Sequence, residues 1–173
     1  MTIRQSTLQN KASSYYKTIN VNDGIEAFTT KRSAFLCHSH KDEQLVKGLI
    51  VIFEEAGVDL YIDWKDHTMP ETPNKETASI IQNRIKQSDV FLFLATSNSK
   101  ASRWCPWEIG YADATPKKIY IIPTIYGNTT YGNEYLELYK RVDIGSSDTK
   151  EGYAIFEPNA QKGQWLSSQT LLF

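Results

Sequence analysis

The segment SRWCPWEIGY at residues 102–111 carries the most unusual combination of side chains in this sequence, with indole rings next to a carboxylate. Helical spacing places Trp104 and Glu108 on one face one turn apart, with Tyr111 next on the Glu108 side. At the ligand-binding end of a sheet, such a helix would set an aromatic plane beside a carboxylate. The alternative is that Trp104 and Trp107 anchor the core while Glu108 is a solvated helix residue. Spacing alone leaves both interpretations open.

Other catalytic classes lack their motifs. The sequence has no Gly-rich phosphate loop of the Walker or dinucleotide type and no Gly-x-Ser-x-Gly turn, which disfavours kinases, GTPases, dehydrogenases and Ser-His-Asp hydrolases. Cys37, His38 and His40 have no acidic or cysteine partner at ligand spacing, so we predict no metal site. The simpler interpretation is a polar loop in which Ser39 or Asp42 caps the following helix.

Four apolar runs predict the strands that would position these residues. They occupy 34–37, 58–62, 90–94 and 119–122, and their spacing leaves room between neighbours for one helix and two loops. Near-continuous apolar strands indicate burial on both faces. We therefore predict an α/β fold in three layers, with a parallel sheet of four to five strands and helices on both faces. Residues 153–156 would supply the fifth strand or an edge piece.

Amphipathic patterns predict helices between the strands. The first spans 42–56 and ends before Gly57, which suits a left-handed stop. We expect Thr77 to cap a second helix, and a third to begin near Ser102 with Pro106 in its first turn.

Two further segments are less regular. The polar loop 65–76 contains two prolines and should be a long exposed excursion of the kind that contacts ligands or partners. Residues 135–142 are predicted as a short helix.

Composition narrows the possible partners. A chain of 173 residues indicates one compact domain, and a net charge of -1 provides no field that would attract nucleic acid. No apolar run approaches the roughly 20 residues of a membrane span. Cys37 and Cys105 form neither a disulfide framework nor a zinc pattern, and no apolar export signal is present. We expect a cytoplasmic protein without a membrane partner.

The order of these motifs resembles a bacterial TIR (Toll/interleukin-1 receptor) domain over residues 33–126. The matching segments, in chain order, are HSHKD at 38–42, DW at 63–64 before the loop that takes the BB-loop position, SDVFLFL at 88–94 and WCPWE at 104–108. The sequence departs from the family at Cys37, where serine is commoner, and at Met69-Pro70, where many animal and plant members have Pro-Gly.

The resemblance implies a flavodoxin-like TIR fold, with residues 1–30 as an N-terminal extension and 31–173 as the TIR domain. In family members that consume NAD⁺, the glutamate at the position of Glu108 is catalytic. NAD⁺ would be the substrate, and no cofactor or metal is implied. The substrate-binding residues expected from motif position and chemistry are Trp104, His38, Ser39, Lys41, Asp63, Trp64 and Tyr111.

The chemistry implied for Glu108 needs only one carboxylate. Nicotinamide is already a cationic pyridinium and leaves neutral, so no general acid is required, whereas ordinary glycosidases use two carboxyl groups. Glu108 would bind the ribose hydroxyls and stabilise the oxocarbenium-like charge at the anomeric carbon. Trp104 would stack on the cationic ring.

Other residues would bind the rest of the dinucleotide. Lys41 and the amides that open the first and third helices would meet the pyrophosphate. Trp64 and Tyr111 would pack on a base. The alternatives are that Lys41 is a solvated helix residue and Trp64 a structural anchor of its loop.

Three functions remain open at this stage. The first is an NAD⁺ glycohydrolase or cyclase that makes ADP-ribose or a cyclic isomer. For this function we favour a cyclic or modified ADP-ribose that acts as a messenger for a separate effector in anti-phage defence. The second is a non-catalytic adaptor that pairs with other TIR domains through loop 65–76. The third is a deoxyribosyltransferase-like enzyme with Glu108 as a covalent nucleophile.

Overall fold

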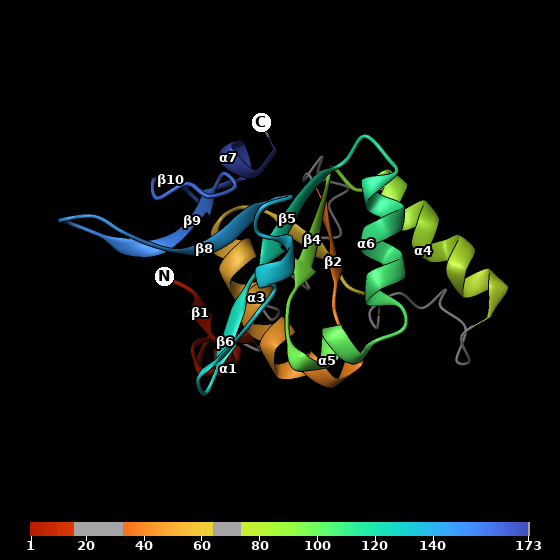
Figure 1. The fold of residues 1–173 in the computed structure, drawn as a ribbon, viewed down its shortest axis with the longest axis horizontal. Helices are drawn as coiled ribbons and strands as arrows, with labels where there is room; N and C mark the ends of the chain where they lie inside the picture. The colour runs from red at the N-terminus through yellow and green to blue at the C-terminus, as the bar shows by residue number, and fades with distance from the viewer. Residues whose placement is uncertain (16–32, 64–73, 173) are drawn as a thin grey trace, which may run out of the picture.

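The computed structural model describes residues 1–15, 33–63 and 74–172. Figure 1 shows a central sheet with helices on both faces. The seven strands run in the order β10-β9-β8-β5-β4-β2-β3. Their bounds are β2 Ser33–Cys37, β3 Asp59–Tyr61, β4 Val90–Leu94, β5 Lys118–Ile122, β8 Lys140–Ser146, β9 Glu151–Phe156 and β10 Gly163–Trp165.

Strands β3, β2, β4, β5 and β8 are mutually parallel, which confirms the predicted α/β fold and its parallel sheet. Strands β9 and β10 extend the sheet by antiparallel pairing, and β10 was not predicted. Because the chain moves outward from β2 to β3 and then returns to β4 on the other side, the topological switch point lies between β2 and β4. Ligands of flavodoxin-like sheets bind near this point.

The predicted helices are present with small shifts. Helix α3 spans Glu43–Glu55, and Gly57 has φ 75°, as the left-handed stop requires. Helix α4 spans Lys75–Gln87, and its N-cap is Asn74 rather than Thr77. Thr77 instead completes the capping box, because its hydroxyl accepts from the Asn74 amide at 3.0 Å.

Helix α5 (Ser97–Ala101) follows β4 and was not predicted, whereas α6 (Cys105–Asp113) is the expected third helix. The predicted helix at 135–142 is wrong. A short 3-10 turn covers Asn133–Tyr135, and the chain then enters β8, which pairs with β5 and β9. Tertiary pairing on both sides has overridden a weak local pattern.

The two faces of the sheet have separate cores. Ala34 and Leu36 belong to the cluster formed with α3, whereas Phe35 and Cys37 belong to the cluster formed with α4 and α6. This alternation follows from the two-residue period of a strand. Cys37, the last residue of β2, therefore faces α6.

The first 15 residues pack against the domain. Strand β1 (Ile3–Arg4) pairs in parallel with β6 (Thr124–Tyr126), which forms a small second sheet with β7 (Thr129–Tyr131). Helix α1 (Gln5–Ala12) packs on α3, and the Leu8 carbonyl lies where a side chain at Gly48 would be. Only glycine allows this close approach.

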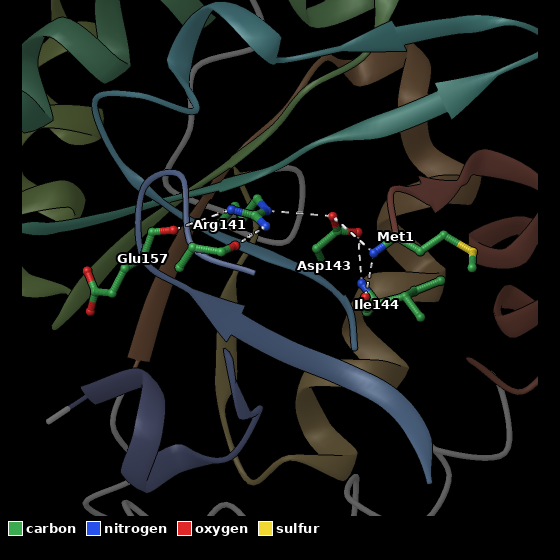
Figure 2. A network of polar contacts seen from close by, with 6 residues as sticks. Met1, Arg141, Asp143, Ile144 and Glu157 are labelled. Carbon is green, nitrogen blue, oxygen red and sulfur yellow. Dashed lines mark hydrogen bonds and ion pairs between the residues drawn. The ribbon is translucent and has the colours of Figure 1, made fainter. Parts of the chain in front are cut away.

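A network of charged groups links the N-terminal segment to β8 (Figure 2). The amino group of Met1 donates to the Ile144 carbonyl at 2.7 Å and lies 3.8 Å from the Asp143 carboxylate. Arg141 approaches the same carboxylate at 3.7 Å. Burial nevertheless raises the pKa of Asp143 to about 6.

The C-terminal helix α7 (Ser168–Leu172) packs beside β9 and β10 at one end of the sheet (Figure 1). Within the described residues, no helix combines the length and the hydropathy that a membrane crossing would need.

Candidate active site

Helix α6 opens at the carboxyl end of the parallel sheet. The Ser102 hydroxyl accepts from the amides of Trp104 and Cys105 at 3.1 and 3.2 Å, so it satisfies donors that the first turn would leave unpaired. Pro106 lies in that first turn, as expected. The helix therefore starts abruptly and brings Glu108 to the base of the site within its first turn.

Glu108 is only 7% exposed and points from α6 towards the end of β2. Burial raises the pKa of its carboxyl to about 8; a hydrogen bond from the Cys37 thiol opposes the shift, and negative charge at Cys105 and Asp63 adds to it. Within the described residues, no lysine or arginine forms an ion pair with Glu108. The alternative that Glu108 is a solvated helix residue is therefore wrong.

The loop after β2 brings His38 to Asp63, the second residue after β3. His38 is buried, its Nδ1 hydrogen-bonds to the Leu36 carbonyl at 2.9 Å, and its Nε2 lies 3.3 Å from the Asp63 carboxylate. His40 approaches the other Asp63 oxygen at 3.5 Å. Burial lowers the pKa of His38, and the Asp63 carboxylate opposes that shift. The predicted residues His38 and Asp63 thus form one polar cluster beside Glu108.

Two predicted residues of the same loop have different surroundings. Ser39 caps the turn that precedes α3, because its side chain accepts from the Lys41 amide at 3.4 Å. The Lys41 side chain is exposed. Among the described residues, no group of three or more His, Cys, Asp and Glu side chains could hold a metal ion.

Asp42 does not cap its helix but bridges the topological switch point. Its buried carboxylate accepts from the Thr96 hydroxyl and from the Asn98 side-chain amide, both at 2.6 Å. Thr96 follows β4 and caps α5 through a capping box with Ser99. These contacts hold the loop after β2 against the loop after β4, and sequence reasoning missed them because Asp42 looked like an ordinary cap.

Three aromatic rings form a row along α6. The ring of Trp104 meets Trp107 edge-on at 5.4 Å, and Trp107 stacks on Tyr111 at 6.0 Å. Lys86 of α4 lies 5.9 Å from the Tyr111 ring. The predicted packing of Tyr111 on a base stays a prediction. Trp104, half-buried at the N-terminus of α6, remains one turn from Glu108.

Part of the predicted site lies outside the described residues. Trp64 and residues 65–73 of loop 65–76 belong to the part that is not described. Their predicted roles in substrate binding and in pairing between TIR domains stay predictions.

The segment after Pro123 lines a hollow of about 130 Å³ that also adjoins the first turn of α6. Its walls include Phe93 of β4, Lys100 of α5, Pro106 of α6 and Tyr135. The rule that ligands gather at the carboxyl ends of parallel strands indicates this region, although no sequence motif marked it.

This fold agrees with the comparison with known families. The family model described as "TIR domain" matches residues 34–155, and the chain belongs to that family.

Two relatives of known name are similar in sequence. The chain is 34% identical over 133 residues to a protein of Bacillus cereus (strain MSX-D12) named "Probable 3' cyclic ADP-D-ribose synthase ThsB'", covering 74% of this chain and 69% of that one. It is 31% identical over 91 residues to "Putative cyclic ADP-D-ribose synthase TIR2" of Cytobacillus dafuensis, covering 51% of this chain and 24% of that one.

Proposed function

We propose that this protein cleaves NAD⁺ to nicotinamide and a cyclic ADP-ribose isomer. The observation that carries the proposal is Glu108, a carboxyl group buried at the carboxyl end of the sheet, one turn from Trp104 and without a cationic partner among the described residues. A buried carboxyl group with a strongly shifted pKa is typical of a functional site. The names of both relatives support a cyclising activity.

The raised pKa of Glu108 suits a cationic substrate. With a pKa of about 8, the free protein holds this carboxyl group mostly protonated at neutral pH. A pyridinium ring bound against Trp104 would bring positive charge close to Glu108, and an opposite charge within a few ångströms favours the carboxylate. Substrate binding would thus create the charge that the reaction needs, in a site from which water is largely excluded.

Bond cleavage moves that positive charge towards the ribose. The electron pair of the bond between the anomeric carbon and nicotinamide goes to the pyridinium nitrogen, so nicotinamide leaves neutral. The oxocarbenium-like carbon then carries the charge, and the Glu108 carboxylate stabilises it.

Cyclisation requires a second nucleophile from the same molecule. A ribose hydroxyl or the adenine attacks the anomeric carbon, and where a hydroxyl attacks, its proton passes to the Glu108 carboxylate. A pKa near the working pH suits that role. Hydrolysis would use water at the same carbon, so exclusion of water favours the cyclic product. Because the Bacillus cereus relative is named as a probable 3′ cyclic ADP-D-ribose synthase, the 3′ cyclic isomer is the first product to look for.

The test follows nicotinamide and the nucleotide product together. Purified protein is incubated with NAD⁺ while free nicotinamide is quantified and the product is identified by mass spectrometry. We expect release of nicotinamide with a cyclic product, and loss of both in Glu108→Gln. Absence of nicotinamide release over a wide range of protein concentration would overturn the proposal and favour the adaptor function.

We also propose that copies of the protein assemble through loop 65–76 and that the product signals to a separate effector in anti-phage defence. Both proposals rest on the family resemblance. A neighbour's loop that completes the site would make specific activity rise with protein concentration, whereas a flat response would contradict assembly.

A further inference from the structure

The hollow beside the first turn of α6 has an apolar, aromatic interior. Phe93 and Ala95, which are 3% and 2% exposed, line it from the end of β4, and Pro106 lines it from α6. The ring of Tyr135 lies 5.2 Å from that of Phe93. Its volume of about 130 Å³ is close to the roughly 150 Å³ of an apolar cavity that binds benzene. The hollow therefore has the size of one flat ring system and not of a whole dinucleotide.

The hairpin β6–β7 and the glycine after it keep this hollow open. Gly132 has φ 92°, and a Cβ at this position would lie 2.7 Å from the side chain of Ala95. Only glycine fits a left-handed and closely packed position of this kind. The chain can consequently pass from β7 to the 3-10 turn Asn133–Tyr135 along the wall of the hollow, to which both segments contribute.

Most polar side chains around the hollow are not used by the fold. The Thr96 hydroxyl is occupied by the bridge to Asp42, and the Ser99 hydroxyl by the capping box of α5. Within the part of the chain that the structure describes, six other lining residues have side chains without a hydrogen bond or an ion pair, namely Lys100, Thr129, Thr130, Tyr131, Glu134 and Tyr135. An apolar hollow with a few convergent polar groups is the usual form of a small-molecule site.

The charges at the rim indicate the polar ends of a ligand. Lys100 of α5 is exposed and offers a cation, which suits a phosphate group. Glu134 is exposed and offers a carboxylate, which accepts from an amino group. The threonine and tyrosine hydroxyls can donate to ring nitrogens, and the aromatic side chains offer faces on which a base can stack. Adenine matches this set, because it has one amino group and several acceptor nitrogens.

We propose that this hollow is a binding site for an adenine nucleotide, with the base between Pro106 and Tyr135, its amino group on Glu134 and its phosphate on Lys100. A pyridinium ring is disfavoured here because the cation of Lys100 would repel it. The site is an alternative to the packing of a base on Tyr111 that the sequence predicts.

Two sources can supply this ligand. The first is the adenylate half of NAD⁺, and this possibility rests on the proposed function. Pro106 and Glu108 are two residues apart on α6, or about 3 Å along the helix axis, so one dinucleotide can engage both the hollow and the buried carboxyl group. The second is a free adenine nucleotide that binds whether or not NAD⁺ is cleaved.

The variants are Lys100→Met and Glu134→Gln, which remove each charge while nearly keeping the size of the side chain. The matched controls are Lys162→Met, before the edge strand β10, and Glu137→Gln, neither of which lines the hollow. All four side chains are exposed, so we expect the four variants to fold normally.

The first measurement is calorimetric titration of the full chain with AMP, which has no nicotinamide to lose. We expect saturable binding, weakened about 5-fold in Lys100→Met and in Glu134→Gln, the upper range for an exposed ion pair, and unchanged in both controls. Ribose 5-phosphate, which lacks the base, should bind more weakly than AMP. Absence of saturable AMP binding would overturn the proposal, as would equal binding by all four variants or binding of ribose 5-phosphate as tight as that of AMP.

The second measurement distinguishes the two sources through the kinetics of nicotinamide release. Competitive inhibition by AMP, with KM for NAD⁺ raised and kcat unchanged in Lys100→Met, would identify the ligand as the adenylate half of NAD⁺. A change of kcat by AMP without competition would identify a free nucleotide. If AMP binding depends on Lys100 and Glu134 but the wild type releases no nicotinamide, the nucleotide site stands while the proposed function falls.

Discussion

The Glu108 amide donates to the Trp104 carbonyl at 2.8 Å, so the indole and the carboxylate leave the chain at the two ends of a single hydrogen-bonded turn. The separation of their Cα atoms is consequently fixed by backbone geometry. The Ser102 hydroxyl fixes the same turn from the other end. The indole of Trp104 and the carboxyl group of Glu108 are thus carried by one hydrogen-bonded turn.

Replacement of Glu108 by Gln should change the pH dependence of stability. The pKa of this carboxyl is about 8 in the folded protein against a usual value of 4.5, so the folded state keeps a proton that the unfolded state has lost between those pH values. Wild-type stability should fall in this window by up to about 1.4 kcal/mol per pH unit and level off above pH 8. Thermal unfolding from pH 5 to 9 should show Glu108→Gln gaining on the wild type as pH rises.

Exposed Glu137 provides the control for that measurement. Glu137→Gln should track the wild type at every pH. A constant difference between Glu108→Gln and the wild type would contradict the buried, mostly protonated state of Glu108.

Trp104 and Trp107 form a matched pair of indoles on α6. Trp104→Leu should lower kcat/KM for nicotinamide release about 5- to 30-fold, because a cation–π contact with the pyridinium ring contributes roughly 1–2 kcal/mol. Trp107, 36% exposed and turned towards Tyr111, should tolerate leucine with little change. Equal losses in the two variants would indicate a general weakening of α6.

Asp42→Ala should destabilise the protein by about 3 kcal/mol, since it removes two charge-assisted hydrogen bonds and leaves Thr96 and Asn98 without their acceptor. Urea unfolding measures the loss. The matched control is Asp148→Ala, at an exposed position between β8 and β9, where less than about 0.5 kcal/mol is expected. A similar small effect at Asp42 would show that the bridge contributes little.

Two helical glycines should respond in opposite directions to alanine. Gly48→Ala would meet the Leu8 backbone, so we expect a loss of about 2–3 kcal/mol or detachment of α1. Gly110→Ala faces open space on α6 and should stabilise by about 0.5–1 kcal/mol. Chemical unfolding of the two variants checks the packing of residues 1–15 on the domain.

The strands could be predicted where burial on both faces leaves an uninterrupted apolar run. β4 matches its predicted bounds for this reason. β8 was missed because its residues do not form an uninterrupted apolar run, with half-exposed Arg141 next to buried Val142, and only its pairing with β5 and β9 makes it a strand. Long-range pairing is invisible to a local pattern.

The candidate site shows the same division. The order of the motifs and the rule that ligands bind at the carboxyl ends of parallel strands singled out Glu108, His38 and Asp63, and the structure places these three residues near one another. Helical spacing predicted Tyr111 beside Glu108 but did not predict that its ring stacks on Trp107. The Asp42 bridge and the Cys37 thiol depend on where β2 and β4 meet the helices, which single-residue chemistry does not specify.

The bridge at Asp42 also restricts the route by which a dinucleotide could enter. In sheets wound this way, phosphate groups usually settle in the gap between the two central strands. Here a carboxylate already fills that gap and satisfies the donors there, so an incoming anion would be repelled. We expect the pyrophosphate to lie instead on the side of the sheet nearer α6. Asp42 would then determine the approach path of the dinucleotide without contacting it.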